Sequence, residues 1–181
     1  MLFVTDIFGN NGHLNPYISL CKSQGRQVQI LDPYAGAKFD FADDQQAYEY
    51  FTQHAGHDYY LDLVQHHFSK LTQPTTVIGF SAGASAVWRA ISQPTSMVDK
   101  FIGFYPGQIR HYLDLAPQCA THLYFPQQEF HFDVEAVIAS LLAKKTVDCV
   151  HSEYQHGFVN TASAHYSAEG STLLLKLLAS N

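Results

Sequence analysis

Cysteine and basic residues are scarce in this chain of 181 residues, and each scarcity excludes a class of protein. The three cysteines, Cys21, Cys119 and Cys149, are widely spaced with no C-x-x-C pair, so neither a disulfide framework nor a structural zinc site is expected. Ten Lys and Arg residues stand against sixteen Asp and Glu, which gives a formal net charge of −6 and no basic run. We therefore expect no nucleic-acid partner and no binding to an anionic membrane.

Long hydrophobic runs are also missing. No apolar stretch reaches the roughly 18 residues of a membrane span, and the chain opens on a strand-like segment rather than on a signal peptide. We expect a cytoplasmic protein, a monomer or small homo-oligomer. A hydrophobic content of 46% at this length predicts a single domain over residues 1–181. A domain of this size can bury a sufficient core without a stabilising disulfide or metal ion.

A Gly-x-Ser-x-Gly motif spans residues 79–83, with Ser81 at its centre. A β-branched, apolar run precedes it, and a helix-compatible run of small residues follows. This is the strand–turn–helix context of a nucleophile elbow. Ser81 would sit on a strained bend, where Gly79 and Gly83 lack the Cβ atoms that would collide.

Strands and helices alternate along the chain. Short apolar runs predict strands over residues 2–8, 28–31, 75–80, 101–105, 121–125 and 146–150. Helices are predicted from the cap Asn15 with Pro16 at N1 to Gly25, over 57–71, after Ser81, over 134–142 and over 165–179, with a loop at 35–46. The alternation predicts an α/β fold with a mainly parallel sheet of about six or seven strands, helices on both faces and no large lid domain.

Candidate catalytic side chains follow predicted strand ends, where the active sites of parallel sheets gather. A serine hydroxyl needs an adjacent base, and the base needs an orienting acid. In α/β-hydrolases the chain order is Ser, acid, His. Ser81, then Glu129 or Asp133, then His156 fit that order. His156 follows the last predicted strand and precedes Gly157, so it is the candidate base.

The acid has two candidates. Glu129 is favoured because it lies in the turn beyond the strand at 121–125. Asp133 remains an alternative, but it directly precedes the helix that begins at Val134, so helix capping also explains it.

Backbone amides are expected to form the oxyanion hole. One is the N–H of Ala82, at the positive end of the helix after Ser81. The other is the N–H of Ile7 in the loop after the first strand, although an ordinary strand-to-loop exit explains this segment too. Substrate contacts are expected from residues near this rim, whose alternative role is core packing: Phe8, Tyr34, Tyr105, Phe158 and His13.

Histidine is abundant, with eleven copies, which raises the question of a metal site. His54, His57, His66 and His67 have no Cys or carboxylate partner at ligand spacing. We expect neither a metal nor a cofactor.

Taken together, these segments resemble the dienelactone hydrolase family of the α/β-hydrolase fold over nearly the whole chain. The matching segments are Asp6 to Gly9, Asp32 to Tyr34, Gly79 to Gly83, Gly103 to Gly107, His156 to Phe158 and Tyr166 to Glu169. The resemblance implies a Ser81, Glu129 and His156 triad with the Ile7 and Ala82 amides as the oxyanion hole.

The sequence departs from the family pattern at three positions. Ser81 stands where the enzyme that names the family has cysteine, and Glu129 where it usually has Asp. Asn160 replaces an arginine that binds the substrate carboxylate, and no second substrate arginine is found around residues 45–60. These departures argue against dienelactone itself as the substrate.

The sequence therefore predicts a serine hydrolase that cleaves a small, partly apolar ester or thioester. Two alternatives remain open at this point: a non-catalytic α/β-hydrolase-like protein that binds a ligand or partner, and a small peptidase.

Overall fold

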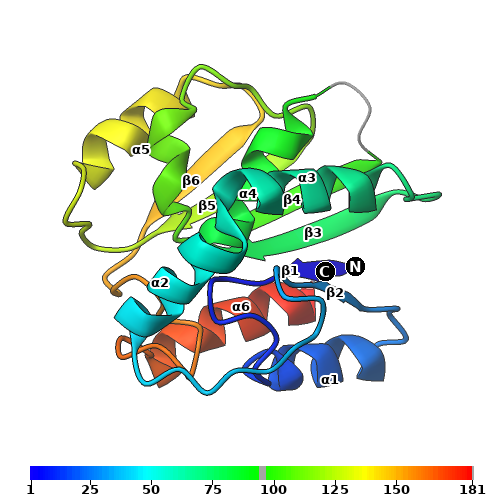
Figure 1. Cartoon of the computed structure of the whole chain (residues 1–181). Helices are drawn as coiled ribbons and strands as arrows, with labels where there is room; N and C mark the ends of the chain where they lie inside the picture. Colours follow the sequence, from blue (N-terminus) through cyan, green and yellow to red (C-terminus); the bar gives the residue numbers. More distant parts are fainter. Residues whose placement is uncertain (94–96, 181) are drawn as a thin grey trace.

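Six parallel strands form the central sheet of the computed structural model, which describes residues 1–93 and 97–180 (Figure 1). Their order is β2-β1-β3-β4-β5-β6, so β1 and β3 lie side by side although β2 comes between them in the sequence. The strands are β1 (Leu2–Val4), β2 (Gln29–Leu31), β3 (Thr75–Phe80), β4 (Val98–Phe104), β5 (Ala120–Phe125) and β6 (Val147–His151).

Helices cover both faces of this sheet (Figure 1). One face carries α1 (Asn15–Ser23) and α6 (Ala168–Ser180). The other carries α2 (Asp44–His54), α3 (Gly56–Phe68), α4 (Ser81–Ile91) and α5 (Val134–Leu142). A short 3-10 helix, η1 (Gly107–His111), follows β4.

The central strands β1, β3 and β4 contribute to two hydrophobic cores because successive side chains point to opposite faces of a sheet. Val77 and Phe101 lie in the core beneath α2–α5, whereas their neighbours Ile78 and Ile102 lie in the core beneath α1 and α6. All four are almost completely buried. Burial on both faces is why these strands read as unbroken apolar runs rather than as alternating ones.

The predicted α/β class is confirmed, and within residues 1–93 and 97–180 no element forms a lid over the sheet. Several boundaries differ. The predicted strand 2–8 ends at Val4, because the chain turns where Gly9 N–H donates to the Asp6 carbonyl oxygen (3.2 Å). Asn15 is the first residue of α1 rather than its cap, which is Leu14.

Helix α2 was not predicted from the sequence, and the loop expected over residues 35–46 is too long because α2 begins at Asp44. Asp43 caps it by accepting a hydrogen bond from the backbone N–H of Gln46 (2.8 Å), and Ala47 and Phe51 are its buried residues. Two buried residues in eleven make a weak periodic signal beside the stronger one of α3. The remaining elements match their predicted ranges to within about four residues. Among the described residues, no helix is both long and apolar enough to span a bilayer.

Candidate active site

Ser81 occupies a sharp bend between β3 and α4. Its φ is +47°, in the left-handed region that non-glycine residues rarely adopt. The close approach of backbone segments explains the two flanking glycines. A Cβ on Gly79 would lie 2.8 Å from Ala84 Cα, and one on Gly83 would overlap the backbone oxygen of Thr5. The bend thus requires glycine on both sides, and the loop after β1 passes directly beside the first turn of α4.

We expect Gly83→Ala to destabilise the protein because neither backbone segment can move without displacing β1 or α4. The cost should be about 3 kcal/mol, at the upper end for overpacking, and should lower the Tm by roughly 6–12 °C. Gly107→Ala is the matched control, because an added Cβ there would meet its nearest neighbours, Glu129 Oε1 and His156 Cε1, at 3.7 Å, an ordinary contact distance. Its free energy of unfolding should change by less than about 0.5 kcal/mol. Equal Tm values for the two variants would contradict this explanation of the bend.

Three side chains from three strand ends form a continuous hydrogen-bonded chain. Ser81 Oγ lies 2.9 Å from His156 Nε2, and His156 Nδ1 lies 2.6 Å from Glu129 Oε1. An ionised carboxylate can only accept, so Nδ1–H donates to Glu129 and Nε2 is left to accept the hydroxyl proton of Ser81. This is the arrangement of a nucleophile, a base and an orienting acid.

Glu129 is positioned by the loop between β5 and α5. This loop is tied to the segment that carries His156, because Gln127 N–H donates to the Tyr154 carbonyl oxygen (2.7 Å). The Glu129 side chain is only 13% exposed, against 35% for His156. The acid–base contact is therefore partly shielded from water, which strengthens a charge-assisted hydrogen bond.

Asp133 has a different role in the structure. Its Oδ1 accepts hydrogen bonds from the backbone N–H groups of Glu135 (3.0 Å) and Ala136 (3.2 Å), which makes it the N-cap of α5. Of the two candidate acids, Glu129 is the one in contact with His156. The catalytic roles of these side chains stay a prediction.

The two candidate oxyanion donors lie on adjoining segments. Ala82 is in the first turn of α4, where backbone N–H groups have no partner within the helix. Ile7 N–H has no hydrogen-bond acceptor among the residues that the structure describes. The Ile7 carbonyl oxygen accepts from the Tyr34 hydroxyl (2.7 Å), which fixes the orientation of this residue.

The residues expected to touch substrate are mostly buried. Phe158 is fully buried, Tyr105 is 1% exposed, and Phe8 is 5% exposed. Tyr105 packs against the His156 ring, with ring centroids 4.9 Å apart. Tyr34 is half-buried. Direct substrate contact by these side chains therefore stays a prediction, and core packing is the role that their burial favours.

His13 is also a buried side chain, at 5% exposure. Its Nδ1 contacts Asn11 Oδ1, and its ring lies edge-on to Phe80, with centroids 6.2 Å apart. Burial lowers the pKa of His13, and the nearby Asp6 carboxylate offsets part of this shift. A largely neutral imidazole packed in the core is the result at neutral pH.

Two residues that support the site were not recognised as such in the sequence. Ser85 Oγ donates to the Ser81 carbonyl oxygen (3.0 Å) and accepts from Gln108 N–H (3.2 Å), linking the bend to η1. Arg110 donates to the Gly107 carbonyl oxygen (2.5 Å) and lies over the Phe132 ring. The contacts from Ser85 to Gln108 and from Arg110 to Phe132 join residues more than twenty positions apart, so neither has a local sequence signal.

Other reactive groups lie away from this chemistry. Burial raises the pKa of all three cysteines, that of Cys149 to about 12, so they are poor nucleophiles at neutral pH. Among the residues described, no group of three or more His, Cys, Asp or Glu side chains is arranged to hold a metal ion.

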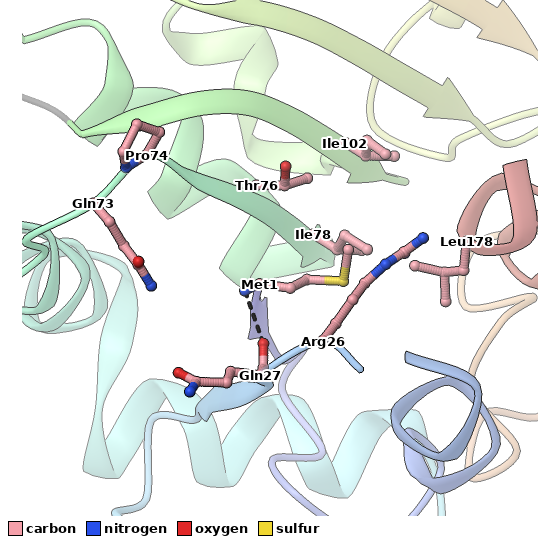
Figure 2. Close-up of a pocket in the computed structure, with 9 residues that line it drawn as sticks. All are labelled: Met1, Arg26, Gln27, Gln73, Pro74, Thr76, Ile78, Ile102 and Leu178. Atoms are coloured by element: carbon pink, nitrogen blue, oxygen red, sulfur yellow. Dashed lines mark hydrogen bonds between the residues drawn. The ribbon is translucent and has the colours of Figure 1, made fainter. Parts of the chain in front are cut away.

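A cavity of about 300 Å³ opens at the opposite end of the sheet, near the start of β3 (Figure 2). Thr76, Ile78 and Leu178 line it together with the Arg26 side chain. Ser81 follows the other end of β3, so this cavity is not part of the candidate active site.

Comparison with known proteins agrees with this architecture. A model of the dienelactone hydrolase family matches residues 1–177. The uncharacterised protein YczH of Bacillus subtilis (strain 168) is 28% identical over 176 residues, which cover 92% of this chain and 84% of that protein.

Solved structures share the fold at low sequence identity. A dienelactone hydrolase-like promiscuous phosphotriesterase from metagenomic libraries has a TM-score of 0.70 at 15% identity, covering 99% of this chain and 83% of that chain. The carboxylesterase CesB of Bacillus subtilis has a TM-score of 0.62 at 9% identity, covering 98% and 82% respectively. The chain belongs to the dienelactone hydrolase family and has the α/β-hydrolase fold.

Proposed function

We propose that this protein is a serine hydrolase that cleaves a small ester or thioester through an acyl-enzyme. The observation that carries the proposal is the chain of contacts from Ser81 Oγ to His156 (2.9 Å) and from His156 to Glu129 (2.6 Å). A serine on a strained bend, with a base at one hydrogen-bond distance and an acid behind the base, is an activated nucleophile.

The reaction has two halves. Ser81 Oγ attacks the carbonyl carbon while its proton passes to His156 Nε2, and the negative oxygen that forms accepts hydrogen bonds from the Ile7 and Ala82 amides. His156 then gives the proton to the departing alcohol or thiol, leaving the acyl group on Ser81. In the second half His156 deprotonates a water, the hydroxide attacks the acyl carbon, and Ser81 recovers its proton as the acid leaves.

Glu129 stays ionised throughout. Its hydrogen bond to Nδ1–H holds His156 in the tautomer whose Nε2 can accept a proton, and its charge stabilises the imidazolium that forms.

A substrate without a carboxylate suits this site. At the position where the resemblance places a substrate-binding arginine, this chain has Asn160, a fully buried side chain whose Nδ2 donates to Asp6 (2.7 Å). Asn160 is thus occupied within the protein and carries no charge with which to attract an anionic substrate.

Substrate comparison tests the proposal against its alternatives. We expect the purified protein to hydrolyse p-nitrophenyl acetate with a kcat/KM at least about 100-fold above that for an aminoacyl p-nitroanilide, because the activated ester has the better leaving group. A preference for the anilide would instead indicate a peptidase. A folded protein that turns over none of these compounds would contradict the proposal and favour a binding protein.

A further inference from the structure

Asp6 joins two loops whose relative position matters for the proposed reaction: the loop that contains Ile7 and the loop that follows His156. Its Oδ1 accepts a hydrogen bond from Phe8 N–H (3.0 Å) in the loop that contains Ile7. Its Oδ2 accepts one from Asn160 Nδ2 (2.7 Å) in the loop that follows His156. The carboxylate is 3% exposed and the asparagine is fully buried, so water does not compete for either bond.

Asn160 is fixed in turn by its own surroundings. Its Oδ1 accepts from Ala162 N–H (2.8 Å), and its backbone N–H donates to the carbonyl oxygen of Gly157 (2.9 Å), the residue next to His156. A path of hydrogen bonds therefore runs from Phe8 N–H through Asp6 and Asn160 to Gly157, the residue that follows His156.

We propose that Asp6 is a positioning residue, which clamps the loop bearing the Ile7 amide to the loop bearing His156 through Asn160. The inference rests on the proposed function, since it gives Asp6 the task of holding one oxyanion donor in place relative to the base. The task is geometric: among the residues described, the hydrogen-bond partners of this carboxylate are Phe8 N–H and Asn160 Nδ2, both uncharged.

Because each hydrogen bond pairs one donor with one acceptor, exchanging the side chains at positions 6 and 160 tests the clamp. In Asp6→Asn, one amide N–H₂ group must face either Asn160 Nδ2 or Phe8 N–H, so a donor meets a donor in both orientations. In Asn160→Asp, two carboxylates face each other. In the double variant Asp6→Asn/Asn160→Asp every bond can form again: Asn at 6 accepts from Phe8 N–H and donates to Asp at 160, which also accepts from Ala162 N–H.

We expect each single variant to lose about 100-fold in kcat for p-nitrophenyl acetate, close to the loss of one oxyanion donor, with KM changed by less than about threefold. The double variant should recover to within about tenfold of the wild-type kcat. Ser163→Ala is the matched control. It breaks a partly buried hydrogen bond from the same loop to Asp44 (2.9 Å), on α2, and should lower the Tm while leaving kcat within about twofold.

Circular dichroism and the Tm establish that each variant is folded. Folded single variants with the wild-type kcat would overturn the inference and leave the proposed function standing. A double variant that does not fold, or that folds and is no more active than the single variants, would also overturn it. If the wild type itself is inert toward esters, the proposed function fails, and the role of Asp6 fails with it.

Discussion

Replacing Ser81 with alanine is expected to abolish the hydrolysis of p-nitrophenyl acetate, with a fall in kcat of about 10⁴-fold or more to the level of the uncatalysed reaction. The reason is that Oγ is both the attacking atom and the contact of His156 Nε2 (2.9 Å). Alanine carries a Cβ as serine does, so the φ of +47° is no more strained in the variant. The free energy of unfolding should therefore change little, and the Tm should confirm this.

A serine far from the site provides the control for this substitution. Ser140 lies on the exposed side of α5, where its hydroxyl donates to the Ala136 carbonyl oxygen (3.0 Å). Ser140→Ala should keep the wild-type kcat. Unchanged turnover in folded Ser81→Ala would mean that another group carries any activity measured.

Glu129→Gln is expected to cost about 10⁴-fold in kcat, because the amide can donate to Nδ1 and stabilise the wrong tautomer of His156. Asp133→Asn should leave kcat within about twofold, since asparagine is as good an N-cap as aspartate. The two substitutions make the same chemical change four residues apart, so their comparison separates the orienting acid from the helix cap. Steady-state kinetics with p-nitrophenyl acetate gives both values, and the reverse ranking would move the acid to Asp133.

The central strands β1, β3 and β4 could be predicted from sequence because they are largely buried on both faces of the sheet. Thr75–Phe80 is an apolar run that ends at a glycine-flanked serine, and this element was placed correctly to the residue. Helix α2 was not predicted because only Ala47 and Phe51 of its residues are buried, which leaves a weak helical periodicity. The first strand was predicted too long because Ile7 and Phe8 are apolar, although the strand ends at Val4 and Phe8 N–H bonds to the Asp6 carboxylate within a turn.

Some features of the candidate site could also be predicted from sequence, whereas others depend on tertiary packing. The order Ser81, Glu129, His156 was readable because parallel strands deliver their ends to one edge of the sheet. The hydrogen bond between Asp6 and Asn160 joins residues 154 positions apart, so no local sequence pattern in either segment predicts it. The aromatic residues illustrate a further limit. Phe158 and Tyr105 flank the site in the sequence, but their burial depends on how α1 and α6 pack against the sheet.

A fluorophosphonate probe phosphonylates a serine, with loss of fluoride, only when an adjacent base activates the hydroxyl, so labelling reports directly whether Ser81 is an activated nucleophile. We predict stoichiometric modification of the wild type, with the adduct located on Ser81 by mass spectrometry. Folded Ser81→Ala should show none, and folded His156→Ala should react far more slowly. A correctly folded wild type that takes no label, or a label that persists without Ser81, would contradict the account of this protein as a serine hydrolase.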